Sequence, residues 1–97
     1  MDEALLRAVL DCSGRPEFVF QGEFDRYNLG TLDTQMIPHF FKSLATSSGL
    51  TLHLTILEGR NDHHKCEGLF KAFARALADA VTLDPRRGTV TSTKGRL

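Results

Sequence analysis

Two adjacent histidines carry the clearest chemical signal, in the stretch Asn61-Asp62-His63-His64-Lys65-Cys66-Glu67. This stretch directly precedes the apolar run "GLFKAFARAL", which has the spacing of a helix. Imidazole and carboxylate groups that are three or four residues apart on a helix can hold one metal ion from successive turns. His63 and Glu67 are four residues apart, and His64 and Glu67 are three apart. Either pair could therefore bind a metal ion.

The helical positions of these side chains predict two metal centres. At about 100° per residue, Glu67 lies at about 40°, Lys71 at about 80° and His64 at about 100° from His63. All four side chains share one quadrant of the helix, but the two imidazoles diverge too far to hold the same ion comfortably. Each centre therefore needs further ligands from elsewhere.

Other residues around this quadrant have competing explanations. His39, on the polar side of another predicted helix, is the obvious additional donor, whereas His53 on an outward strand face is explained by solvent exposure. Histidine pairs also occur by chance on solvated helices, and Lys71 is more simply a solvated residue on spacing alone. The predicted core stripe contains Cys66, Leu69, Phe70, Phe73, Leu77 and Val81, and the predicted solvent face contains Lys65, Ala72, Arg75 and Asp79.

Alternating side chains predict three strands. Residues 4–12 place alternate apolar side chains on one face, and residues 17–24 do the same with Phe18, Phe20 and Phe24. The turn sequence "SGRP" between these strands predicts a hairpin. Residues 50–57 form the third alternating stretch.

Two helices complete the predicted fold. The first begins at a cap formed by Asp33 or Thr34 and ends at Gly49, and its apolar stripe contains Ile37, Phe40, Phe41, Leu44 and Ala45. The second begins at Asn61 or Asp62 and runs to about Val81. The order strand, strand, helix, strand, helix predicts an α+β two-layer sandwich, with a small sheet carrying both helices on one face. A similar two-layer fold occurs in a ribosomal protein.

Length and composition limit the class of protein. Ninety-seven residues predict a single domain over residues 1–97 with a modest core, so a second copy or a related half is expected to pack against it. Twelve basic and twelve acidic side chains give zero formal net charge, which argues against nucleic-acid and membrane partners. Cys12 and Cys66 have neither zinc nor disulfide spacing, which favours reduced thiols and a cytoplasmic protein. No signal peptide and no apolar run of roughly 20 residues is found.

Five segments in register resemble imidazoleglycerol-phosphate dehydratase. They are "MDEALLRAVLDCSGRPEF", "MIPHFFKSLA", "GLTLHL", "GRNDHHKCEGLFKAFARAL" and "STKG". Together they extend from about Asp2 to the terminus, in the order of the second half of that enzyme. Proteins of this family are duplicated, and each half carries a His-His-x-x-Glu motif and an earlier histidine. The present sequence holds this motif once.

The resemblance implies a metal centre shared between chains. The positions that match the family's metal ligands are His39, His63, His64 and Glu67. The family binds two manganese ions, each held by three imidazoles and a carboxylate from different halves and neighbouring subunits. Such a ligand set would also accept zinc, cobalt, nickel or iron. The complete enzyme is expected to be a large homo-oligomer built from trimers.

The resemblance also implies a substrate, imidazole glycerol phosphate, which the family dehydrates to imidazole acetol phosphate in histidine biosynthesis. Arg15, Ser92 and Lys94 match the family's phosphate-binding positions, and Lys71 is a further candidate for the same site. Asp2 and Glu3 match an acidic pair and are candidates for proton transfer. Thr91 stands where the family usually has proline before "STKG".

Three functions remain open on these grounds. The first is the carboxy-terminal half of the dehydratase, which needs the missing amino-terminal half for a complete active site. The second is a non-catalytic half-domain that forms homo-oligomers around metal. The third, an RNA-binding module on the ribosomal version of the fold, is disfavoured by the neutral charge and by the lack of a basic stripe.

Overall fold

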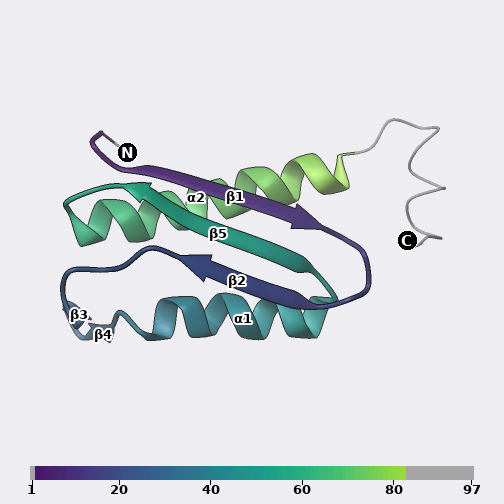
Figure 1. Ribbon diagram of the computed structural model, residues 1–97, viewed down its shortest axis with the longest axis horizontal. Coiled ribbons are helices and arrows are strands. Elements are labelled where there is room, and N and C mark those ends of the chain that lie inside the picture. Colours follow the sequence, from purple (N-terminus) through teal and green to yellow (C-terminus); the bar gives the residue numbers. More distant parts are fainter. Residues whose placement is uncertain (1, 83–97) are drawn as a thin grey trace.

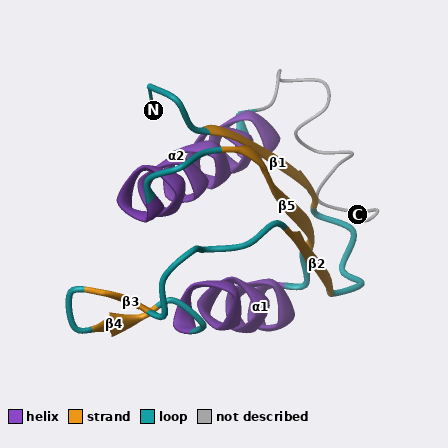
Figure 2. Cartoon of the chain, turned by 60° about the vertical axis from the view of Figure 1, so that its left-hand side comes forward, coloured by secondary structure: helices purple, strands orange, loops and turns teal. Residues whose placement is uncertain are grey.

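A small sheet and two helices form two layers in the computed structural model, which describes residues 2–82 (Figure 1). In chain order the elements are β1 (Leu5–Asp11), β2 (Glu17–Gln21), β3 (Asn28–Leu29), β4 (Leu32–Asp33), α1 (Met36–Ser48), β5 (Thr51–Glu58) and α2 (Asp62–Val81). Both helices cover the same face of the sheet, as Figure 2 shows. The α+β two-layer sandwich expected from the sequence is therefore confirmed. Within residues 2–82, neither helix is long and apolar enough to cross a membrane.

The predicted hairpin between the first two strands is wrong. The sheet order is β1-β5-β2, so β5 lies between them, antiparallel to β1 and parallel to β2. The connection over residues 12–16 is long enough to cross two strand spacings, about 10 Å. The connection and the first residue of β2 are held to the residues just before β5, because the N–H of Gly14 donates to the carbonyl of Gly49 and that of Glu17 to the carbonyl of Leu50, both at 3.0 Å.

The period-two patterns correctly identify the faces of the strands. Leu52 and Leu54 of the central strand β5 are fully buried against the helices, where Phe41 of α1 and Leu69 of α2 meet them. The inward residues of β1 and the phenylalanines of β2 surround this core. The outer face of β1 remains exposed, including Leu5 and Val9.

The first helix differs from its prediction at the start. Its N-cap is Gln35, which makes no side-chain capping bond. Asp33 instead accepts a hydrogen bond from the Gln35 N–H at 2.9 Å, one residue before the helix, and the Thr34 hydroxyl donates to the carbonyl of Arg26 at 2.7 Å. The predicted stop is confirmed, because Gly49 ends α1 with φ of 70°. Phe40 is half exposed at the edge of the predicted stripe.

The second helix has its predicted bounds, and Arg75 and Asp79 of its predicted solvent face are exposed, but three other residues differ from their predicted burial. Lys65, which the projection places toward solvent, is only 3% exposed. The chain that follows β2 passes along this side of α2 and covers it, as the contacts of Lys65 with Glu23 and Asp25 show. Conversely, Phe70 and Val81 of the predicted core stripe are exposed. A helical projection considers one helix alone, so it cannot predict burial by the segment that follows β2.

The polar segment after β2 holds a feature that the sequence reading misses. Residues 28–33 form a two-stranded ribbon, β3 paired with β4, in addition to the three strands predicted from alternation. Figure 2 shows this ribbon extending beyond the start of α1.

Candidate functional site

The first turn of α2 holds the adjacent histidines in a defined orientation. Asn61 is the N-cap, and its Oδ1 accepts a hydrogen bond from the N–H of His64 at 3.0 Å. This cap satisfies one of the free N–H groups at the helix start and confirms the predicted beginning of α2. The ring centroids of His63 and His64 are 6.4 Å apart with an interplanar angle of 70°. The two rings are thus arranged nearly edge to face, and each contacts a different carboxylate.

His63 lies with Glu67 and Lys71 on the exposed side of the helix. The Nε2 of His63 is 3.4 Å from Oε1 of Glu67, and the Nζ of Lys71 is 3.4 Å from Oε2 of the same carboxylate. The side chain of His63 is 72% exposed and that of Glu67 is 39% exposed. An imidazole nitrogen and a carboxylate oxygen thus face the same open space, where they could form part of a metal centre.

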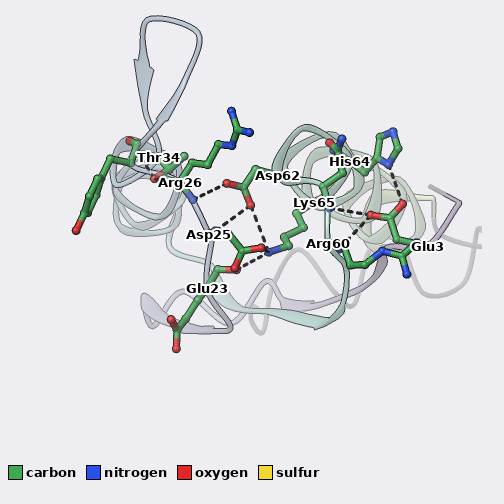
Figure 3. A network of polar contacts seen from close by, with 11 residues as sticks. Glu3, Glu23, Asp25, Arg26, Thr34, Arg60, Asp62, His64 and Lys65 are labelled. Carbon is green, nitrogen blue, oxygen red and sulfur yellow. Dashed lines mark hydrogen bonds and ion pairs between the residues drawn. The ribbon is translucent and has the colours of Figure 1, made fainter.

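His64 turns toward a different carboxylate. Its Nδ1 is 2.8 Å from Oε1 of Glu3, and both side chains are largely covered, at 28% and 20% exposure (Figure 3). The other oxygen of Glu3 accepts hydrogen bonds from the N–H groups of Arg60 at 3.0 Å and Asn61 at 2.9 Å. The hydrogen bond with His64 and those with Asn61 and Arg60 lower the pKa of Glu3 to about 2. The carboxylate is therefore ionised at neutral pH.

Of the acidic pair at the amino terminus, only Glu3 is built into this arrangement. Asp2 is exposed and has φ of 27°, in the left-handed region. A carboxylate with so low a pKa as that of Glu3 is a weak base, and three donors already occupy its oxygens. Its contacts are those of a fixed hydrogen-bond acceptor.

The other predicted metal donor is not brought to this site. His39 is exposed on α1, and His53 is exposed on the outer face of β5. Burial, followed by the charge of Glu67, raises the pKa of the Cys66 thiol, which disfavours a thiolate ligand. Within residues 2–82, no three histidine, cysteine, aspartate or glutamate side chains come together as a metal site. One chain thus offers only part of each predicted centre.

Arg15 lies at the opposite end of the sheet from the histidines (Figure 1). Its carbonyl accepts a hydrogen bond from the Thr51 hydroxyl at 2.8 Å, and its N–H donates to the Ser13 hydroxyl at 3.1 Å. These contacts fix the backbone while the residue remains exposed. The eight residues of β5 that separate the two ends span about 26 Å. Ser92 and Lys94, the other two predicted phosphate contacts, lie outside the described residues.

A buried ion pair beside the histidines is a feature that the sequence reading missed. The Nζ of Lys65 is 3.3 Å from Oδ1 of Asp62, and each side chain is 3% exposed (Figure 3). The ammonium also contacts Oδ2 of Asp25 at 3.3 Å and donates to the carbonyl of Glu23 at 3.1 Å. Asp62 accepts from the N–H groups of Asp25 at 2.9 Å and Arg26 at 2.7 Å. The network attaches the segment after β2 to the start of α2.

The pKa of Asp62 reflects these contacts. Burial would raise it, but the N–H groups of Asp25 and Arg26 and the ammonium of Lys65 outweigh burial and lower the pKa below its ordinary value of 3.8. The only sequence sign of the pair is the spacing of three residues, which is equally common on solvated helices.

The attached segment forms one wall of a pocket next to His63. The pocket has a volume of about 310 Å³ and brings two arginines, Arg26 and Arg60, near that histidine. Its lining consists of Asp25, Arg26, Asn28, Leu29, Gly30, Arg60, Asn61, Asp62 and His63. No local sequence pattern indicates this pocket, because part of its wall comes from the β3–β4 ribbon, which the alternation of side chains did not predict.

Comparison with known proteins identifies the family of this chain. The model of the family "Imidazoleglycerol-phosphate dehydratase" matches residues 1–77. The imidazoleglycerol-phosphate dehydratase of Erythrobacter litoralis is 51% identical over the whole chain, and that of Methanoculleus marisnigri is 54% identical. The histidine biosynthesis bifunctional protein HisB of Xanthomonas axonopodis pv. citri is 54% identical.

The chain spans only part of these relatives. It covers 50% of the length of the first two and 25% of the third. In the crystal structure of imidazoleglycerol-phosphate dehydratase from Staphylococcus aureus, 87% of this chain matches 49% of that chain, with a TM-score of 0.84 and 42% identity. From its sequence and its fold, this chain belongs to the imidazoleglycerol-phosphate dehydratase family.

Proposed function

We propose that this chain forms the carboxy-terminal half of a metal-dependent imidazoleglycerol-phosphate dehydratase. In this role it takes part in the cytoplasmic removal of water from imidazole glycerol phosphate to give imidazole acetol phosphate, a step of histidine biosynthesis. The observation that carries the proposal is the pair of adjacent imidazoles in the first turn of α2, which contact different carboxylates, one beside Glu67 and one beside Glu3. Membership of the family supports it, as does the match to half the length of its relatives.

The donor set fits a first-row divalent metal. His63 and Glu67 offer one nitrogen and one oxygen to a common space, and His64 is the donor for a second centre. Manganese, with zinc, cobalt, nickel or iron as alternatives, suits such a mixture of nitrogen and oxygen. His39 would complete a centre from another copy or from the missing half. The chemistry that bound ions supply is positive charge at the imidazole ring of the substrate, which stabilises the electron density left when the neighbouring carbon loses its proton.

The phosphate of the substrate requires charged donors, for which Arg15, Lys71, Ser92 and Lys94 are the candidates. The backbone of Arg15 is held by hydrogen bonds with Ser13 and Thr51, and the residue is exposed. Since β5 separates this loop from the histidines by about 26 Å, a small substrate cannot contact both within one chain. We therefore infer that each active site combines different copies with the missing amino-terminal half. A large homo-oligomer built from trimers would provide such interfaces.

Reconstitution tests this function. The chain should be mixed with a separately produced amino-terminal half of the Erythrobacter litoralis relative in the presence of Mn²⁺. We expect the mixture to dehydrate imidazole glycerol phosphate and each half alone to be inactive, because neither contains a complete ligand set. His64→Ala should abolish the activity, while His53→Ala should preserve it. A folded, associated and manganese-loaded mixture without activity would contradict the proposal.

A second candidate is a non-catalytic half-domain that forms metal-linked homo-oligomers. It is favoured by large apolar side chains exposed on both layers, namely Leu5, Val9 and Leu57 on the strands and Met36, Phe40 and Phe70 on the helices. Mass measurement in solution, with Mn²⁺ and then with a chelator, separates the cases. An assembly of the chain alone that dissociates without metal supports this candidate, and a monomer indifferent to metal eliminates it.

A further inference from the structure

Glu3 is held in a way that points it at one ring nitrogen. Its Oε2 accepts hydrogen bonds from the N–H groups of Arg60 and Asn61, which directly precede α2. Its Oε1 is thereby left facing Nδ1 of His64 at 2.8 Å (Figure 3). The neighbouring Ala4 is buried close to the turn that carries Arg60, because a Cβ added to Gly59 would lie 3.3 Å from that of Ala4. The segment before β1 is thus anchored against the start of α2.

This contact determines where the proton of a neutral His64 resides. An ionised carboxylate accepts hydrogen bonds and donates none, so the nitrogen that faces it must carry the hydrogen. In a neutral imidazole the lone pair is then on the other nitrogen, Nε2. His64 would present Nε2 as its metal-binding atom, away from Glu3. A carboxylate behind a histidine ligand is the common arrangement that fixes both the tautomer and the orientation of the ring.

The adjacent histidine lacks this support. Within residues 2–82 the only polar partner of the His63 side chain is Glu67, which it approaches through Nε2. His63 is also much more exposed, at 72% compared with 28% for His64. The two imidazoles are therefore not equivalent. The ring of His64 is held from behind by Glu3, whereas the ring of His63 contacts Glu67 on the exposed side of the helix.

We propose that Glu3 is a positioning residue, which holds His64 as the Nδ1–H tautomer so that Nε2 is ready to bind a metal ion. The inference rests on the proposed function for the ligand role of His64. It assigns Glu3, 61 residues before His64, a role distinct from the proton transfer suggested by its sequence position. A purely structural role, in which Glu3 only stabilises the turn before α2, predicts no effect on the tautomer or on metal affinity.

Ring ¹⁵N chemical shifts of the metal-free chain, recorded where His64 is neutral, test the tautomer. We expect the Nδ1–H form of His64 in the wild type. In Glu3→Gln the amide oxygen can still accept from the two backbone N–H groups, which turns the NH₂ group toward Nδ1 and favours the Nε2–H form. Glu17→Gln, which alters an exposed glutamate at the far end of the sheet, should leave the spectrum of His64 unchanged. A wild-type Nε2–H tautomer, or a Glu3→Gln variant with the wild-type tautomer, would overturn the proposal.

Calorimetric titration of Mn²⁺ into the complex with the amino-terminal half tests the consequence for metal binding. Glu3→Gln should weaken affinity by roughly 10–100-fold, the usual effect of removing such a partner. The same substitution in a His64→Ala background should have no further effect, because Glu3 acts through His64. Unchanged affinity in Glu3→Gln would indicate a purely structural role, and equal losses in both backgrounds would show that Glu3 does not act through His64; either result would reject the inference. If His64 has the Nδ1–H tautomer but the complex binds no Mn²⁺, the proposed function and the ligand role of His64 are rejected. The tautomer assignment then still holds.

Discussion

Asp62 and Lys65 show how a single pair of charged residues can organise the surroundings of the candidate site. Both side chains are 3% exposed, and their partners come from the backbone of residues 23, 25 and 26 and from the carboxylate of Asp25. Taking two charges out of water is costly, so the pair persists because nearly every polar atom has a partner. Its structural effect is to hold one wall of the pocket against the first turn of α2.

Removing one partner of this pair should destabilise the chain. We expect Lys65→Met to lower the free energy of unfolding by about 3 kcal/mol, near the low end for breaking a buried pair, because backbone N–H groups still satisfy Asp62. Urea unfolding followed by circular dichroism measures this loss. Lys42→Met, which removes an exposed charge from α1, is the matched control and should change stability by less than about 0.5 kcal/mol. Equal stability of the two variants would contradict the burial of Lys65.

The lowered pKa of Asp62 makes part of this stability depend on pH. Because its pKa in the folded chain is below the ordinary 3.8, the carboxylate contributes fully above about 3.8. The contribution is lost as the pH falls from there through the folded pKa. The stability difference between wild type and Asp62→Asn should therefore be constant at neutral pH and shrink in this acidic window. Unfolding curves measured from pH 7 to pH 2.5 check this, with the exposed Asp79→Asn as control. A difference that grows on acidification would contradict the direction of the shift.

At the scale of elements, local signals were sufficient for the end of α1 and the start of α2, but not for the start of α1 or for strand pairing. The predicted cap at Asn61 and stop at Gly49 depend on residues within one turn, and both are observed. The hairpin prediction failed because β5, which follows 30 residues later, inserts between β1 and β2. Alternation identifies the buried face of a strand but carries no information about its neighbour. For the same reason, the burial of Lys65 by a distant segment could not be read from helical spacing.

Gly22, directly after β2, is an element boundary that only glycine fits. Its φ is 115°, and an added Cβ would lie 2.6 Å from the Cβ of Ile56 in β5. We expect Gly22→Ala to lower the free energy of unfolding by about 2–4 kcal/mol, from backbone strain together with overpacking. Gly14→Ala is the matched control, because its φ of 80° is also positive but nothing lies within 4 Å. It should cost only about 1–2 kcal/mol. Equal losses in urea unfolding would show that the close approach to Ile56 does not matter.

At the scale of the whole molecule, the candidate functional residues are divided between two ends of one sheet. His63 and His64 follow β5, whereas Arg15 precedes β2 at the other end (Figure 1). The sequence placed these residues on the correct elements, but the distance between them depends on the sheet order, which local patterns did not reveal. Under the proposed function, this separation of about 26 Å implies that each active site takes Arg15 and the histidines from different copies.

This division predicts complementation between two inactive variants. If each active site takes Arg15 from one copy and His64 from another, Arg15→Ala and His64→Ala chains should each be inactive when assembled with the amino-terminal half. Mixed before assembly, they should regain about a quarter of the wild-type activity, because random assembly into symmetric oligomers gives that share of sites both intact residues. Mixing Arg15→Ala with the double variant Arg15→Ala/His64→Ala is the control and should remain inactive, since no copy then provides Arg15. Mass measurement should first show that the equal mixture of the single variants forms mixed assemblies. If such assemblies stay inactive, both residues serve one site from the same chain, contrary to their separation across the sheet.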